Sequence, residues 1–161
     1  MKNLSLIALL LLSVLTFSCT KRMDCCLLAY QPFITAEKNN VKWDAQVGTT
    51  KIAPDSIAIT GTQTEERLIM RIKFAGKGTY TLTGNQAKFF TTVGQDVITS
   101  DYYVDNAAAS TIQITEYDYN QAIITGTYSV ALKKTSADKY HPSYPENVKF
   151  LSGKFSTYLK N

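Results

Sequence analysis

The stretch TIQITEYDYNQAIITGTYSVAL, residues 111–132, alternates apolar and polar side chains on both sides of a short polar segment. Five apolar residues mark the alternation: Ile112, Ile114, Tyr128, Val130 and Leu132. Period-two alternation gives a strand one buried face and one solvent-facing face, as in antiparallel sheets. The polar segment 118–120 between the two runs is typical of a turn. The stretch therefore predicts two antiparallel strands joined by a turn.

The same chemistry recurs along most of the chain. Residues 41–47 and 68–74 alternate in the same way, and Trp43 falls among the core-facing residues of the first of these runs, where we expect it to pack. Asn39-Asn40 fits the positive φ of a tight hairpin. Long helical periodicity is absent. We expect an all-β domain of roughly nine to ten strands, either an antiparallel β-sandwich or a small closed β-barrel. The sequence does not choose between the two.

Three glycines each stand two residues before an aromatic side chain. They are Gly78, Gly126 and Gly153, followed by Tyr80, Tyr128 and Phe155. Glycine in a strand marks a bulge or a close approach, and an aromatic ring then fills the space that the missing side chain leaves. We interpret the recurrence as shared strand chemistry and not as a tandem repeat.

The N-terminus has the pattern of a secretory signal peptide. Lys2 precedes a mostly aliphatic run, Leu4 to Phe17, and Cys19 stands where cleavage is expected. The run is about 14 residues long, shorter than the roughly 20 that a membrane-spanning helix needs. We expect Cys19 to carry a lipid anchor; cleavage without a lipid and a permanent membrane helix are the alternatives. The predicted organisation is a signal peptide at 1–18, a lipidated tether at 19–32 and a single all-β domain at 33–161.

The chain resembles a family of small Bacteroidota outer-membrane lipoproteins whose domain has no assigned function. The resemblance covers about residues 33–158, with modest motifs in a characteristic order: 33–36 followed by 43–45, 78–82, 112–118 leading to 124–128, and 152–155. It implies an exported all-β domain and brings no catalytic residues. The first hairpin departs from the family, which has a glycine where this chain has Asn39-Asn40. Surface-displayed relatives carry an acidic run after the lipidated cysteine, whereas residues 20–24 hold one acid. The resemblance therefore implies the periplasm-facing leaflet of the outer membrane.

Charge and cysteine content exclude several classes of function. The 17 Lys and Arg exceed the 13 Asp and Glu by little and are scattered, so no nucleic-acid partner is expected. All 3 cysteines precede residue 27, so the domain is not a disulfide scaffold. Cys25 and Cys26 are adjacent, and an intrachain bond between them would be strained. Unpaired thiols and an interchain bond both remain open.

One loop is the candidate ligand site. It lies between residues 133 and 147 and contains Tyr140, His141 and Tyr144. Two tyrosines and a histidine could stack on a sugar or a peptide, since loops on rigid scaffolds often carry binding. The alternative is a proline-stiffened loop whose aromatic rings cover one end of the domain. His141 is the single histidine and lacks neighbours at metal-ligand spacing, so neither a metal nor a cofactor is expected.

No catalytic signature is present, so we expect a non-catalytic binding or interaction module of the cell envelope. It would be held to the membrane through Cys19 and would have an unidentified envelope protein or glycan as partner. A barrel that carries a small apolar ligand is one alternative. A glycan hydrolase that uses Asp101, Asp105 or Asp118 is a weaker one. Glu65-Glu66 is expected to be a solvated turn.

Overall fold

The computed structural model describes residues 30–135 and 144–159. The described strands all belong to one unit, Gln31–Asn161. The first strand begins at Phe33.

Ten strands and one short 3-10 turn make up the described chain, which confirms the all-β prediction. The strands are β1 (Phe33–Lys38), β2 (Val41–Ala53), β3 (Ser56–Gln63), β4 (Glu66–Lys73), β5 (Gly78–Thr81), β6 (Ala87–Val93), β7 (Val97–Val104), β8 (Thr111–Asp118), β9 (Ile123–Lys134) and β10 (Asn147–Tyr158); the 3-10 turn η1 is Gly84–Gln86.

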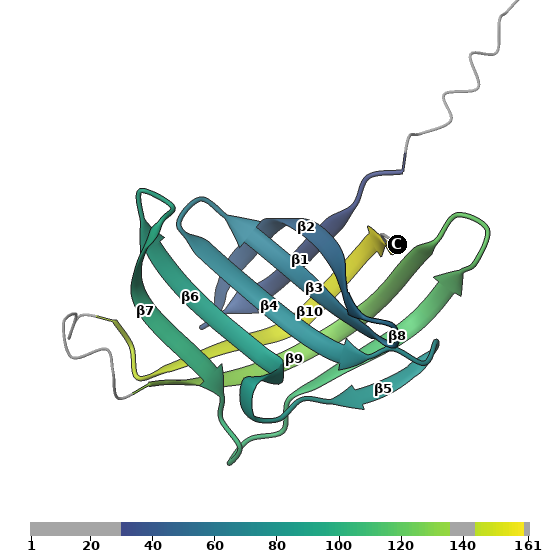
Figure 1. The fold of residues 1–161 in the computed structure, drawn as a ribbon. Coiled ribbons are helices and arrows are strands. Elements are labelled where there is room, and N and C mark those ends of the chain that lie inside the picture. The colour runs from purple at the N-terminus through teal and green to yellow at the C-terminus, as the bar shows by residue number, and fades with distance from the viewer. Residues whose placement is uncertain (1–29, 136–143, 160–161) are drawn as a thin grey trace, which may run out of the picture. The chain divides into compact units, whose positions relative to one another are not determined.

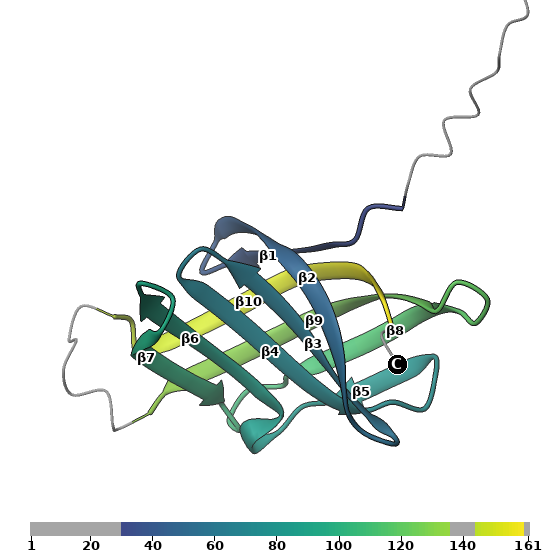
Figure 2. The ribbon, with the colours of Figure 1, turned by 45° about the horizontal axis from the view of Figure 1, so that its top comes forward.

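Eight of the strands close into a ring (Figure 1). The order is β10-β1-β2-β3-β4-β6-β7-β9, and β9 pairs with β10 to complete it. Strand β9 also pairs with β8, which in turn pairs with β5, so that these two strands extend the sheet beyond the ring. Figure 1 and Figure 2 both show β5 beside β8. Closure removes most sheet edges, and it favours the barrel of the two expected architectures.

The inward faces of the strands form one hydrophobic core. Ile112, Ile114, Tyr128, Val130 and Leu132 are all buried, as the alternation predicts. The expected packing of Trp43 is confirmed: it is 1% exposed, and its ring meets that of Phe150 edge-on with centroids 5.0 Å apart. Val41 differs from the expectation. It follows the hairpin turn directly as the first residue of β2 and is 66% exposed.

One glycine in β9 and one in β10 each pack against an aromatic ring from the other of these two paired strands. In the ladder between β9 and β10, Gly126 lies opposite Phe155 and Gly153 lies opposite Tyr128. A Cβ at Gly126 would approach the Phe155 ring to 2.8 Å, and one at Gly153 would approach the Tyr128 ring to 2.6 Å. The predicted close approach is confirmed at these two positions. Gly78 does not follow the pattern, because nothing lies within 4 Å of its Cβ position.

The first hairpin turns as its sequence predicts. Asn39 and Asn40 have φ values of 49° and 67°, and Lys38 pairs with Val41 across them. Left-handed φ at both central residues is the type I′ geometry, whose twist matches that of the strands. Asparagine tolerates this conformation, so the turn forms without glycine.

Candidate functional site

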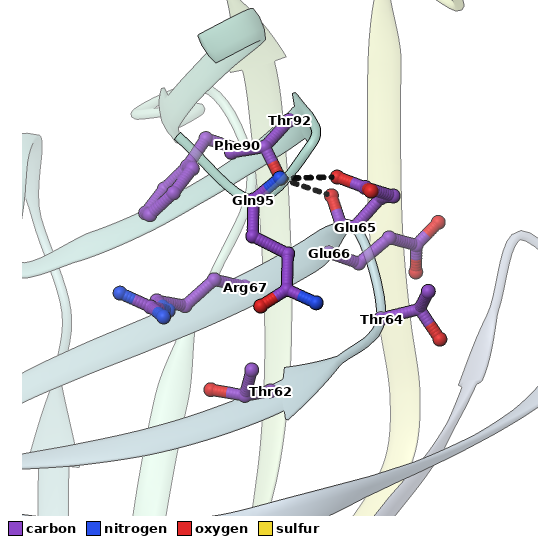
Figure 3. A pocket seen from close by; sticks show the side chains of 8 residues that line it. All are labelled: Thr62, Thr64, Glu65, Glu66, Arg67, Phe90, Thr92 and Gln95. Atoms are coloured by element: carbon purple, nitrogen blue, oxygen red, sulfur yellow. Dashed lines mark hydrogen bonds between the residues drawn. The ribbon is translucent and has the colours of Figure 1, made fainter. Parts of the chain in front are cut away.

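A polar groove lies on the outside of the ring where the β3–β4 and β6–β7 turns meet (Figure 3). It consists of two hollows of about 30 Å³ and 520 Å³, which share Thr62, Thr64 and Gln95. We call it the turn groove and define it by Asp44, Gln46, Thr62, Thr64, Glu65, Arg67, Phe90, Thr92 and Gln95. The larger hollow falls in the usual size range of ligand sites, about 300–1,000 Å³, and every residue that lines it except Ala45 has a polar side chain.

The floor of the turn groove is one cross-strand row. Gln46 pairs with Thr62, Thr62 with Arg67, and Arg67 with Phe90, from β2 through β3 and β4 to β6. Next to Arg67 in sequence, Leu68 is fully buried, so the row belongs to the opposite, outward face. With neighbouring strands about 4.8 Å apart, the three steps span about 14 Å.

Glu65 ties the two turns together. Its carboxylate Oε2 accepts hydrogen bonds from the Thr92 hydroxyl at 2.6 Å and from the Gln95 backbone N–H at 3.2 Å. Its backbone carbonyl accepts the Thr92 N–H at 2.8 Å. The Thr92 hydroxyl is the main cause of a pKa for Glu65 below its ordinary value, since a hydrogen bond to the charged form stabilises that form. The β6–β7 turn is thereby held over β3 and β4, as Figure 3 shows.

Two residues of the turn groove have strained backbones. Thr64 has φ of 40° and Gln95 has φ of 67°, both in the left-handed region. That region is unfavourable for ordinary side chains and most of all for a β-branched one such as threonine. Strain of this kind collects at functional sites. Sequence reasoning missed both residues, because turn propensity favours glycine or asparagine at such positions.

The expectation that Glu65-Glu66 forms a solvated turn is confirmed for the turn at Thr64-Glu65 and wrong for Glu66, which begins β4 and is partly buried. Glu66 forms an ion pair with Lys38, and the two side chains are 23% and 25% exposed. Its other carboxylate oxygen accepts the indole N–H of Trp43 at 2.9 Å. Successive residues of an extended chain point to opposite faces. Glu65 therefore reaches the β6–β7 turn, while Glu66 points toward the core and accepts the hydrogen bond of the buried Trp43 indole.

Basic and aromatic side chains continue the outward face beyond the turn groove. The Arg67 guanidinium lies 5.7 Å from the Phe90 ring centroid. The Lys88 ammonium lies 5.5 Å from the Phe90 centroid and 5.3 Å from that of Tyr103. It also forms an ion pair of 3.1 Å with Asp101. These cation–π contacts fix the orientation of Arg67 and Lys88 on the surface.

The ligand loop expected from the sequence is only partly within the described residues. Tyr140 and His141 lie outside them, as do Cys19, Cys25 and Cys26. The Tyr144 hydroxyl lies 3.2 Å from Thr99 Oγ1 in β7. Beside it, the Tyr102 hydroxyl donates to the Pro145 carbonyl at 2.9 Å. Residues 144–145 are therefore fastened to β7.

The three aspartates weighed as catalytic acids have separate local partners. Asp101 pairs with Lys88. Asp105 Oδ1 accepts the backbone N–H of Ala107 at 3.0 Å. Asp118 Oδ1 accepts the N–H groups of Asn120 and Gln121 in the β8–β9 turn, at 2.8 and 3.1 Å. These contacts are those of an ion pair and two Asx turns, and they do not form a shared site.

Residues 30–135 and 144–159 contain no group of three or more His, Cys, Asp or Glu side chains placed to hold a metal ion. Over the same ranges, no helix has the length and apolar character needed to cross a bilayer.

Comparison with known proteins gives one match. The model of a family described as a domain of unknown function, DUF6252, matches residues 30–157. No curated protein and no solved structure matches the chain. The matched range contains every residue of the turn groove and almost all of the ten strands. On this match, the chain belongs to the DUF6252 family.

Proposed function

We propose that this chain is an exported lipoprotein, anchored through Cys19, whose barrel is a non-catalytic binding module of the bacterial cell envelope. The signal-like N-terminus with Cys19 after it supports the anchor. Two or more acyl chains on one residue hold a protein stably at a membrane. The resemblance to Bacteroidota lipoproteins supports a periplasm-facing position on the outer membrane.

The observation that carries the binding role is the turn groove. It is open to solvent, polar, and built with backbone strain at Thr64 and Gln95. A strained conformation persists only where the surrounding structure holds it, and here Glu65 does so through the β6–β7 turn. If these turns were purely structural, glycine at positions 64 and 95 would adopt the left-handed backbone at a lower conformational cost than threonine or glutamine does.

Two alternatives are supported less well. A carrier of a small apolar ligand needs an interior cavity, and the ring is packed with buried side chains such as Trp43, Phe150 and Phe155. A glycan hydrolase needs two carboxyl groups that face one bond. Asp101, Asp105 and Asp118 each have local partners instead.

The anchor is tested by Cys19→Ala in cells fed radiolabelled palmitate. The expected result is loss of label and release of the protein from the membrane fraction. The double variant Cys25→Ala/Cys26→Ala is the control and should keep both. Full labelling of the Cys19→Ala protein would refute the anchor.

The binding role is tested by blocking the groove. Photocrosslinking in cells from a diazirine-bearing amino acid at Asp44 of the tagged full chain should give a recurrent envelope adduct, and Gln46→Trp should abolish it. Gln113→Trp is the matched control, since Gln113 is also an exposed glutamine on a strand of the same sheet. An adduct that survives Gln46→Trp as well as Gln113→Trp would overturn the groove as the binding surface.

A further inference from the structure

The turn groove carries almost no excess charge. Glu66 is paired with Lys38, and Asp44 with Lys42 at 2.7 Å. One acid and one base remain, Glu65 and Arg67. Among the described residues, no carboxylate forms an ion pair with Arg67. A surface balanced in this way selects neither strongly anionic nor strongly cationic ligands.

The groove is rich in groups that both donate and accept hydrogen bonds. The side chains of Gln46, Thr62, Thr64 and Gln95 are amides and hydroxyls, which do both. Within the described ranges, none of these four side chains hydrogen-bonds to another residue. They line the two hollows, which share Thr62, Thr64 and Gln95, and Figure 3 shows these three residues among those that line the smaller one. A ligand with many hydroxyl groups can satisfy them.

The groove lacks the features that other macromolecules need. A peptide that binds in a groove uses apolar pockets for its side chains or an open strand edge. The row from Gln46 to Phe90 lies on the face of paired strands, and Phe90 is its one large apolar residue. Nucleic acid needs several cations along its phosphates, and only Arg67 is present here.

We propose that the turn groove binds a short stretch of neutral glycan. This inference rests on the proposed binding function and names the ligand class of the same site. Sugar hydroxyls pair with Gln46, Thr62 and Gln95, and the row of about 14 Å accommodates a short oligosaccharide. The planar Arg67 guanidinium, 5.7 Å from the Phe90 ring centroid, ends the row with a flat surface against which a sugar ring can lie.

The backbone strain fits this role. Figure 3 shows the Gln95 side chain pointing from the β6–β7 turn toward Thr62, while Thr64 stands on the opposite turn with its side chain directed away from Gln95. Both residues have left-handed backbones. Because Glu65 holds the turns in place, both side chains are positioned before the ligand arrives. Preorganisation of this kind reduces the ordering that binding would otherwise require.

The test uses the full chain in detergent micelles with defined sugars. The neutral probes are cellotetraose, maltotetraose, laminaritetraose and chitotetraose, and tetragalacturonate is the acidic probe. Saturation-transfer NMR detects contact, and titration gives the dissociation constant. At least one neutral probe should bind and should bind more tightly than tetragalacturonate.

Matched variants locate the contact. Gln46→Ala and Gln95→Asn should each weaken binding of the neutral probe at least about fivefold, with melting temperatures unchanged. Asparagine tolerates the left-handed backbone at position 95, so that variant shortens the side chain without new strain. Gln113→Ala is the control and should bind as the parent chain does.

Three results would overturn the inference. They are binding of tetragalacturonate alone, binding of a neutral probe that both groove variants leave unchanged, and no binding of any probe. If no probe binds while Gln46→Trp still abolishes the cellular adduct, the ligand class is wrong and the binding function stands. If the adduct also persists in Gln46→Trp, both proposals fail.

Discussion

At the scale of single residues, Glu65 determines the shape of the turn groove. It is the one side chain that bonds both to Thr92 and to the Gln95 backbone, and so joins two turns that are 30 residues apart in sequence. Its hydrogen bonds are stronger to the charged carboxylate than to the neutral acid. The groove therefore depends on pH through this residue.

Thr92→Val should raise the pKa of Glu65 toward its ordinary value. Valine keeps the shape of threonine and removes the hydroxyl that is the main cause of the lowered pKa. Carboxyl chemical shifts followed through an NMR pH titration measure the change. Thr115→Val, which removes an exposed hydroxyl on β8, should leave the Glu65 titration unaltered.

The sign of the pH effect follows from the direction of the shift. The pKa of Glu65 in the folded protein lies below the ordinary value of 4.5. Its contribution to stability is therefore present above pH 4.5 and is lost as the pH falls through the lowered folded pKa. The parent chain should lose stability in that window, and Thr92→Val should lose less. Equal acid sensitivity of both proteins would contradict this role for Glu65.

Thr64→Gly should stabilise the protein. A left-handed backbone costs about 1–2 kcal/mol for a residue with a Cβ, while glycine adds about 0.5–1 kcal/mol of conformational entropy to the unfolded chain. The expected net gain is about 0.5–1 kcal/mol, or about 1–4 °C in melting temperature for a chain of this length. Thermal unfolding followed by circular dichroism measures it. A lower melting temperature would mean that Thr64 is not strained.

At the scale of elements, the ladder between β9 and β10 depends on paired glycines and rings. Gly126→Ala should destabilise the fold by about 1–3 kcal/mol, the usual cost of overpacking. The new Cβ would lie 2.3 Å from the Gln113 backbone carbonyl oxygen as well as against Phe155. Backbone cannot move aside as a flexible side chain can.

Gly48→Ala is the matched control, because nothing lies within 4 Å of its Cβ position in β2. It should be neutral or slightly stabilising, since alanine restricts the unfolded chain more than glycine does. Urea unfolding compares the two variants. Equal midpoints for both would show that the ring contacts do not constrain position 126.

The sequence predicts where the strands lie and which of their residues are buried, but it does not predict that the sheet closes into a ring. Alternation in 111–132 predicts two strands and their buried residues, and each is where the pattern places it. That pattern is local. The ring also needs pairings between segments distant in sequence, such as Tyr102–Val104 with Leu132–Lys134 and β1 with β10. Local alternation fits a sandwich and a barrel equally well.

The turn groove was missed for a related reason. Its row takes one residue from each of four strands, and no short motif records that arrangement. Thr64 and Gln95 lack the usual turn signals, so nothing in the sequence marked their left-handed backbones. The predicted loop residues Tyr140 and His141 lie outside the described chain and stay a prediction.

At the scale of the whole molecule, we expect the part of the sheet around β9 to be rigid. The β5–β8 extension should unfold locally more often. β9 pairs with β10 along most of its length and with β7 and β8 on its other edge. β5 has four residues and pairs only with β8. Central β9 amides should exchange with solvent at least about tenfold more slowly than those of β5. Equal rates would mean that β5 belongs to the rigid unit.

Because the interior of the barrel is filled with side chains, a ligand has to bind on its outer surface. The core supports the strands, the strands hold the cross-strand row, and Glu65 holds the turns above it. The lipid anchor proposed at Cys19 would keep this surface at the membrane, where envelope glycans are concentrated. On this proposal, the outward face that carries the turn groove binds neutral glycan.

The measurement that tests this claim most directly is site-specific photocrosslinking in cells. A photoreactive amino acid replaces Asp44, which lines the groove without a proposed ligand contact, in one strain and Gln113 in another, and the adducts are identified by mass spectrometry. Saccharide adducts are expected from position 44 and none above background from position 113. Saccharide adducts in equal yield from both positions, or none from position 44, would contradict the glycan-binding role of the groove.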